Sequence, residues 1–487
     1  MTKKTKLTKK KVILSIIYIV LTVYFLVFFY SLTKPLPEGI SLEGGARYVS
    51  EDEIDFLYDL NYLHQNGSNV IEQEIFKNVF FLVDNAENFI IIDMFLFNAD
   101  YTNKERFIPL TTTLKDKLIA KKKSNPNLQI YFITDEINNF YGSYTSEEIK
   151  ELKENNINVI ITDLTKLRDS NPAYSSFWRI FLQPFGTSGD GWITHPLGNK
   201  NHNVTLRSYL KLINTKANHR KVIVADFNSS IYSLVTSANP HEASSLHSNV
   251  ALLIKDGIHK DIIEAEKSVA KFSSSEIKIN NSLIPEISEN KDIQIQFLTE
   301  QKIRSNLLKD IDSSTSGETI DLAMFYLSDR KIIKSLLNAQ ERGVNVNIIL
   351  DSNKDAFARE KNGIPNRQVA YELFKKSDGK INIRWYNTRG EQFHTKMIII
   401  KKKDRTIVYL GSANFTKRNL GDLNLEADVK LSSPNNKSII IEIDSYFNRL
   451  WNNVNGSYTL DFESYKDSSK TKYLLYRFQE FSGFSSF

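Results

Sequence analysis

The chain has 487 residues, of which 41% are hydrophobic, so it is long enough to bury two ordinary cores. It contains no cysteine, which excludes disulfides, thiolate metal sites and a cysteine nucleophile. Its net charge of +6 equals the six lysines of the first eleven residues, and the remaining 57 basic and 57 acidic residues cancel, which argues against a general polyanion-binding protein.

The N-terminal segment predicts a membrane anchor. A basic tail at 1–11 precedes an uncharged apolar run at 12–32, and 21 helical residues span about 31 Å, the thickness of a bilayer hydrocarbon core. Because the lysines come first, we expect a single-pass protein with its N-terminus in the cytoplasm and its catalytic domains outside. A cleaved signal peptide is the alternative, but the run is too long for one and no small-x-small cleavage site follows it.

Strand-like and helical segments alternate along the rest of the chain, with a serine- and asparagine-rich linker at 273–290. The expected strands are 89–97, 128–134, 158–162, 222–225, 231–236 and 250–254 before the linker, and 319–327, 344–350, 381–386, 396–400 and 407–410 after it. The expected helices are 146–155, 258–272 and 330–342. This order predicts two α/β domains, 40–272 and 291–487, each a mixed, mostly parallel sheet flanked by helices.

A set of polar residues recurs at the same offsets in both halves and indicates an internal duplication. The recurring residues are His219, Lys221, Ser237, Asn239 and Asn249 in the first copy, and His394, Lys396, Ser412, Asn414 and Asn424 in the second. A Met-Phe pair also recurs, at 94–95 and 324–325, but 230 rather than 175 residues apart. Much of the excess lies at 168–210, which is either a lid or binding loop, or a structural excursion packed on the domain.

Residues two apart on a strand point to the same side, so each histidine projects together with its lysine. If the halves pack about a pseudo-twofold axis, two imidazoles, two ammonium groups and several neutral donors converge on one site. Such a site suits a phosphodiester, because the lysines neutralise its oxygens while serine and asparagine add hydrogen bonds. One neutral histidine can attack phosphorus and the other, protonated, can donate to the leaving oxygen.

The doubled motif resembles the signature of the phospholipase D superfamily, H-x-K-x4-D followed by G/S-S-x-N. The first copy is complete with Asp226, whereas Lys401 replaces the aspartate in the second. Glu426 resembles the glutamate of the family's N-x-E and is expected to orient a histidine. The resemblance implies catalysis by His219 as nucleophile and His394 as general acid/base, with Lys221, Lys396 and Asp226 in support. The recurring serines and asparagines, with Glu426, are the expected substrate-binding residues.

The resemblance implies two pseudo-twofold-related phospholipase D-like domains, no cofactor and no metal, and a site that one chain completes. Four further histidines, at 195, 202, 241 and 247, lack the spacing of a zinc site. The expected activity is phospholipid hydrolysis or a cardiolipin synthase-like phosphatidyl transfer, with phospholipid and membrane as partners. A single-stranded DNA or RNA nuclease is the alternative, which the balanced charge disfavours, and a catalytically inactive envelope protein is the third possibility.

Overall fold

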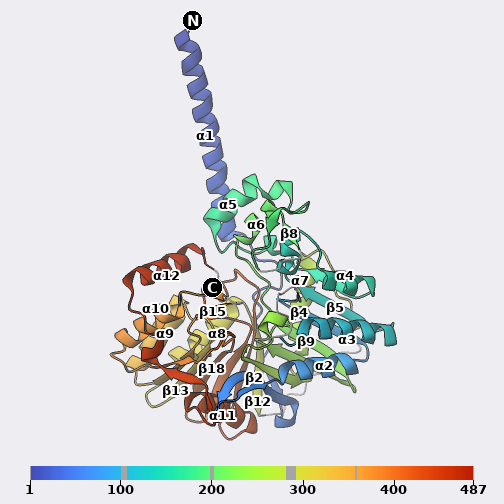
Figure 1. Ribbon diagram of the computed structural model, residues 1–487, viewed down its shortest axis with the longest axis vertical. Coiled ribbons are helices and arrows are strands. Elements are labelled where there is room, and N and C mark those ends of the chain that lie inside the picture. The colour runs from blue at the N-terminus through green and yellow to red at the C-terminus, as the bar shows by residue number, and fades with distance from the viewer. Residues whose placement is uncertain (1, 100–106, 198–201, 281–291, 357–358, 486) are drawn as a thin grey trace.

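The computed structural model describes residues 2–99, 107–197, 202–280, 292–356, 359–485 and 487; residues 281–290 of the expected linker fall outside this part. Helix α1 (Thr2–Thr33) projects from one end of the globular part (Figure 1). Its segment Thr8–Thr33 is long and apolar enough to cross a membrane, and an 18-residue stretch within it has a mean hydropathy of 2.8 and is not buried in the protein. It is therefore a candidate membrane anchor.

The first half forms a mixed sheet around a buried central strand, β4, whose sequence FIIIDM is apolar on both faces. Its strands, in spatial order, are β21 (Gly456–Ser457), β2 (Ile54–His64), β11 (Asn249–Lys255), β10 (Ser230–Thr236), β9 (Lys221–Phe227), β4 (Phe89–Met94), β5 (Gln129–Thr134) and β6 (Asn158–Ile161), with β3 (Asn69–Glu72) beside β2.

The second half repeats this arrangement. Its strands, in spatial order, are β1 (Arg47–Val49), β12 (Ile293–Thr299), β20 (Ala427–Pro434), β19 (Arg405–Gly411), β18 (Lys396–Lys401), β13 (Thr319–Met324), β14 (Asn345–Leu350), β17 (Asn382–Tyr386) and β22 (Thr459–Asp461). The halves exchange edge strands, because β1 pairs with β12 and β21 pairs with β2. A short N-terminal strand thus completes the second sheet, and a short C-terminal strand completes the first.

The sheets are mixed, as expected, but they are not mostly parallel. Among the described residues, parallel ladders are confined to β4–β5–β6 and β13–β14–β17, and the other ladders are antiparallel. The cause lies in the connections: β9 and β10 are joined by a two-residue turn with Asn228 and Ser229 at positive φ, and such hairpins force antiparallel pairing. The sequence-based expectation gave too much weight to strand–helix alternation.

Helices cover the outer faces of the two sheets, and the inner faces pack against each other (Figure 1). The outer helices are α2 (Ile75–Asn85), α3 (Leu110–Ser124) and α4 (Glu147–Glu154) on the first sheet, and α8 (Gln301–Asp312), α9 (Arg330–Glu341), α10 (Asn366–Lys376) and α12 (Lys470–Ser482) on the second. The shared core between the sheets also takes in α7 (His259–Phe272) and α11 (Ser438–Trp451). The remaining helices, α5 (Pro172–Phe181) and α6 (Leu206–Leu212), belong to the 168–210 segment.

Local sequence explains the helix boundaries well. In α9, Asp329 caps the first turn by accepting hydrogen bonds from the backbone N–H groups of Lys331 and Ile332, at 2.9 and 3.1 Å. The helix ends before Gly343, which takes the left-handed conformation at φ +88°. The expected helix at 330–342 is therefore confirmed to within one residue.

Candidate active site

Both H-x-K motifs lie where the two halves meet. Lys221 begins β9 and Lys396 begins β18, so each histidine stands just ahead of a central strand. The His219 N–H donates to Leu425 O at 2.9 Å, and the Ser248 N–H donates to Gln392 O at 3.2 Å. These two bridges between the halves place both motif copies at one seam.

The two lysines are arranged in the same way. Each is buried, and its ammonium group donates to the carbonyl oxygen of the histidine two residues earlier: Lys221 to His219 O at 2.6 Å, and Lys396 to His394 O at 2.9 Å. Each histidine and its lysine are therefore held together as one unit.

The phenylalanine of each recurring Met-Phe pair packs beside one histidine and its lysine. Phe95 lies 4.9 Å from the His219 ring and 5.2 Å below the Lys221 ammonium. Phe325 lies 5.0 Å from the His394 ring and 5.4 Å from the Lys396 ammonium. The phenylalanine ring fixes the imidazole plane and attracts the lysine charge, so these two residues belong to the site although they were not predicted there.

Each histidine is oriented by a residue from the opposite half. His219 Nδ1 lies 3.0 Å from Glu426 Oε2, and His394 Nδ1 lies 3.1 Å from Asn249 Oδ1. The two motif copies, far apart in the sequence, therefore meet in a single site. Glu426 orients a histidine, and the histidine is that of the other copy.

The counterpart of Glu426 in the first copy is Asn249. Ala251, which stands 32 residues after His219 as Glu426 stands 32 residues after His394, does not take that position. The Ser237 hydroxyl contacts Asn249 Oδ1 at 3.1 Å, and the Ser412 hydroxyl contacts Glu426 Oε2 at 2.5 Å. Asn424, which shares the offset of Asn249, instead accepts from the Ala217 N–H at 3.0 Å. The sequence match between the two asparagines was a coincidence of spacing, because the second copy has two more residues between its serine and its orienting position.

The hydrogen bonds also settle which ring nitrogens carry protons. Asn249 donates through Nδ2 to His247 O at 3.0 Å, so its Oδ1 is an acceptor and His394 Nδ1 must donate to it. Glu426 already accepts from Ser412 and Asn419, and His219 Nδ1 likewise donates to it. In both neutral rings, Nε2 is left with its lone pair.

Burial dominates the electrostatics of the site. Burial lowers the pKa of His219 and of His394 well below the usual range, and the charges of Lys221 and Lys396 lower both further. Burial also lowers the pKa of Lys221 to about 7 and that of Lys396 well below its ordinary value. Burial raises the pKa of Glu426 to about 7, whereas the charge of Lys221 lowers it. Two buried ammonium groups beside two imidazoles favour the binding of an anion.

Two aspartates that sequence reasoning missed hold the backbone that carries the histidines. Asp135 accepts from the Asn218 N–H, and Asp351 accepts from the Phe393 N–H, at 2.6 and 2.8 Å. Asp135 directly follows β5, and Asp351 directly follows β14. This repeated position after a parallel strand is the sequence signal from which both aspartates could have been predicted. Burial raises the pKa of Asp135 to about 8 and that of Asp351 to about 6.

Asn239 and Asn414, which each follow a recurring serine by two residues, differ in their contacts. Asn239 accepts from the Leu96 N–H at 3.3 Å, beside Phe95. The Oδ1 atom of Asn414 is buried and has no hydrogen-bond partner within the described residues. Asn414 can therefore take part in binding a further group.

Known proteins share this organisation. The family described as cardiolipin synthase, PLD-like domain, matches residues 307–451. A phospholipase D of Rickettsia prowazekii is 31% identical over 165 residues, which cover 33% of this chain and 72% of the relative. The chain belongs to the phospholipase D superfamily.

Further comparisons agree. A phospholipase D of Rickettsia typhi is 28% identical over 165 residues, again covering 33% of this chain and 72% of the relative. The crystal structure of a phosphatidylserine synthase from Haemophilus influenzae shares the fold with a TM-score of 0.58 at 10% identity, covering 91% of this chain and 96% of that one. The protein is a phospholipase D-type phosphodiesterase or phosphatidyltransferase.

The aspartate of the family motif lies outside the site in this phospholipase D-type protein. Asp226 stands near the far end of β9, five residues or about 16 Å along the strand from Lys221. It accepts from the Asn88 and Phe89 N–H groups, at 2.9 and 2.8 Å, and so fixes the start of β4. Lys401 at the matching position pairs with Asp321 at 2.7 Å. The missing aspartate therefore leaves the second half-site intact.

Replacing Asp226 by alanine should destabilise the protein without changing its chemistry. We expect the free energy of unfolding to fall by about 1–3 kcal/mol, because the buried Phe89 N–H and the part-buried Asn88 N–H lose a charged acceptor. Urea unfolding of the detergent-solubilised protein and its turnover number measure the two effects separately. A large fall in kcat with unchanged stability would place Asp226 in the chemistry after all.

His195, His202 and His247 each lie close to another aromatic or imidazole ring. Within the described residues, no group of three or more histidine, aspartate or glutamate side chains is placed to hold a metal ion. His195 contacts the Tyr144 hydroxyl at 3.2 Å, and the His202 ring stacks on the Tyr144 ring at 4.4 Å. His247 lies closer to the chemistry, with its ring 5.8 Å from that of His394.

Proposed function

We propose that the protein is a membrane-anchored, metal-independent phospholipid phosphodiesterase that acts through a phosphohistidine on His219. The observation that carries this proposal is the pair of cross-half contacts, in which a carboxylate orients His219 and an amide orients His394. These contacts bring both lysines and both imidazoles into one site. Since both motif copies lie in one chain, a monomer completes the site.

In the first step, His219 Nε2 attacks phosphorus and the bond to the headgroup oxygen breaks. That oxygen takes the proton from His394 Nε2, and the phosphatidyl group remains on His219. Lys221 and Lys396 neutralise the charge that develops on the non-bridging oxygens. The products of this step are a free alcohol and a phosphohistidine.

In the second step, neutral His394 takes a proton from water or from an alcohol, whose oxygen attacks phosphorus. The bond between phosphorus and His219 Nε2 breaks and restores the neutral ring. Water yields phosphatidic acid, and an alcohol yields a new phosphatidyl ester. One site therefore supports both hydrolysis and phosphatidyl transfer.

The unlike orienting residues support different roles for the two histidines. A ring that carries Nδ1–H and a phosphoryl group on Nε2 is positively charged, and the Glu426 carboxylate stabilises that charge on His219. The neutral Asn249 amide gives the His394 imidazolium less stabilisation, which makes it the stronger acid. The asymmetry thus favours His219 as nucleophile and His394 as proton donor.

Helix α1 supports a location at the membrane. Its lysines precede the apolar span, which favours an N-terminus in the cytoplasm and a catalytic part on the opposite side. Phospholipid headgroups of that leaflet then lie beside the globular part. Phospholipid is accordingly the proposed substrate, in preference to a nucleic acid.

Incubation of the full-length protein in nanodiscs with a fluorescent phospholipid tests the proposal. We expect phosphatidic acid in buffer, a phosphatidyl alcohol when a primary alcohol is added, and no loss of rate with EDTA. A single-stranded oligonucleotide is the parallel substrate. Cleavage of the oligonucleotide alone would establish a nuclease instead, and turnover of neither substrate would indicate an inactive protein.

The pH dependence of the reaction follows from the lowered histidine pKa values. His394 must be protonated in the first step, and burial lowers its pKa below 6.5, so the alkaline limb of kcat/KM should fall below pH 6.5. A bound phosphodiester anion offsets the charges of Lys396 and Lys221, so the limb of kcat should lie at higher pH. Initial rates across pH 4–9 measure both limbs, and coincident limbs above pH 7 would contradict this assignment.

A further inference from the structure

Large apolar side chains are exposed at the end of the globular part from which α1 projects. In the 168–210 segment, Phe177 and Phe181 of α5 are 44% and 41% exposed, and Phe185 and Trp192 are 71% and 73% exposed. On α12, the exposed apolar residues are Leu474, Leu475, Phe478 and Phe481. Figure 1 shows α5 beside the lower end of α1, with α12 on the same side of the globular part.

Helix α5 packs directly on the last turns of α1. The Tyr24 hydroxyl donates to Ala173 O at 2.8 Å. Tyr24, Val27 and Phe28 are half-buried and Ser31 is buried, whereas the residues between them are exposed. This i, i+3, i+4, i+7 spacing is one face of a helix, so the final two turns of the apolar span are in contact with protein.

The length of the span then determines the depth of α5. The apolar run 12–32 covers about 31 Å, but the part that precedes Tyr24, 12–23, covers only about 18 Å. A bilayer hydrocarbon core is about 30 Å thick. If α1 crosses the bilayer, the turns that contact α5 must also lie within the hydrocarbon core. Helix α5 is carried to that depth with them.

We propose that α5, the segment through Trp192 and the exposed face of α12 are embedded in the bilayer leaflet nearest the globular part. This membrane-embedded face, defined by Phe177, Phe181, Phe185, Trp192, Leu474, Leu475, Phe478 and Phe481, takes lipid acyl chains and headgroups as its partner. The inference rests on the membrane anchor of the proposed function.

Helix α12 has the pattern of a helix that lies in an interface. Leu474, Phe478 and Phe481 follow one another at i, i+4 and i+7 and point outward. The opposite face is buried on the second half, where Glu480 accepts from the Ser328 hydroxyl at 2.8 Å. Arg477 is exposed beside the apolar stripe, as is typical of helices that bind anionic lipid surfaces.

The end of α12 touches the segment that carries α5. The Tyr174 and Phe484 rings lie 6.3 Å apart, and the Thr215 hydroxyl donates to Gly483 O at 3.3 Å. The two parts of the membrane-embedded face are therefore joined to one another, although they belong to opposite halves of the chain.

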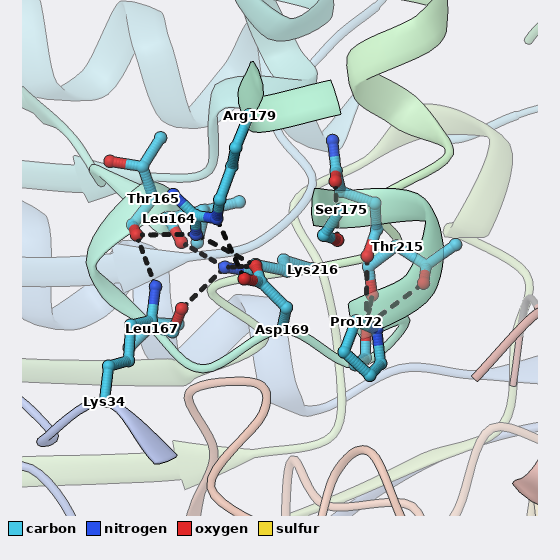
Figure 2. A network of polar contacts seen from close by, with 12 residues as sticks. Lys34, Leu164, Thr165, Leu167, Asp169, Pro172, Ser175, Arg179, Thr215 and Lys216 are labelled. Carbon is cyan, nitrogen blue, oxygen red and sulfur yellow. Dashed lines mark hydrogen bonds and ion pairs between the residues drawn. The ribbon is translucent and has the colours of Figure 1, made fainter. Parts of the chain in front are cut away.

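Figure 2 shows a buried ionic network around Asp169 that connects Arg179 of α5 to Lys216, and Lys216 precedes the catalytic strand β9 in the chain. Asp169 accepts from the Arg179 guanidinium of α5 at 2.9 and 3.0 Å and pairs with Lys216 at 2.5 Å. Lys34, directly after α1, donates to Thr165 O at 2.7 Å within the same network. Lys216 is three residues before His219 in the chain. The ionic network therefore links the end of α1 and helix α5 to the segment that carries the nucleophile.

The absence of cysteine allows a direct measurement of depth in the full-length protein. Single substitutions Phe177→Cys and Phe481→Cys, labelled with a nitroxide in nanodiscs, should give high accessibility to oxygen and low accessibility to a nickel chelate. Phe81→Cys on α2 and Ile441→Cys on α11 are matched controls, because these residues are 48% and 55% exposed and the helices α2 and α11 lie far from α1 in Figure 1. Probes at 177 and 481 that behave like the controls would overturn the proposal.

A second arm tests the effect on turnover. The double variant Phe478→Ser/Phe481→Ser should turn over bilayer phospholipid at least about tenfold more slowly and leave hydrolysis of a water-soluble p-nitrophenyl phosphodiester unchanged. Equal rates with the wild type on bilayers would contradict a role in lipid access. The depth measurement does not depend on activity, so it distinguishes failure of this inference from failure of the proposed function.

Discussion

Replacing His394 by alanine should trap the phosphohistidine, whereas replacing His219 should prevent its formation. A p-nitrophenolate leaving group departs without a proton donor, so His394→Ala should still release p-nitrophenol from a phosphatidyl p-nitrophenyl ester. The second step lacks its base, and release should stop after about one equivalent per enzyme. His219→Ala has no nucleophile and should give no burst, with a loss of overall rate on the order of 10⁴-fold or more.

A change of leaving group distinguishes the roles of His219 and His394 further. With a natural alcohol headgroup, His394→Ala should lose about 10²–10⁴-fold in the first step, because the departing alkoxide has no proton. Acid-quenched gels with phosphorus-labelled lipid detect the trapped enzyme, and Asp226→Ala is the control that leaves both histidines in place. A burst from His219→Ala together with none from His394→Ala would exchange the two assignments.

The doubled motif located the centre of the site because equal spacing along two similar strands means equal positions in space. His219 with Lys221 and His394 with Lys396 occupy matching starts of β9 and β18, and the expected strands coincide with those observed. The positions of the predicted strands and helices followed from apolar runs and glycine stops, which are local signals, whereas β2, β12, β20 and most of the outer helices were not predicted. The sequence therefore predicted which histidine and lysine form each half-site.

The contacts between half-sites could not be derived in this way. Glu426 orients His219 of the other copy, and the two-residue difference that makes Asn249 its counterpart appears in the serine contacts and in the ladder register. Asp226 occupies the aspartate position of the motif, yet its side chain accepts a hydrogen bond from the first residue of β4 and stabilises the start of that strand. Spacing alone does not say whether a conserved-looking side chain faces a site or the far end of its strand.

Replacing Arg220 by leucine should destabilise the protein strongly. Arg220 lies between His219 and Lys221, directly ahead of β9, and is fully buried. It donates to Glu266 at 3.1 Å and to Glu300 at 2.8 Å, which joins the first half to the second. Removing it leaves two buried carboxylates without a cation, and we expect the free energy of unfolding to fall by about 3–5 kcal/mol at pH 7.

The sign of the pH dependence distinguishes this cause from a simple loss of packing. Burial raises the folded-state pKa of Glu266, and the charge of Arg220 lowers it. Loss of Arg220 should therefore raise this pKa further, so the deficit is present at neutral pH and shrinks as the pH falls and the Glu266 carboxylate is protonated. Thr395 holds the matching position in the second half and contacts the Tyr446 hydroxyl at 3.1 Å, so Thr395→Val should cost about 1 kcal/mol at any of these pH values. Urea unfolding at pH 5 and pH 7 measures both variants. A deficit in Arg220→Leu that is equal at the two pH values would mean that packing, and not charge, joins the halves there.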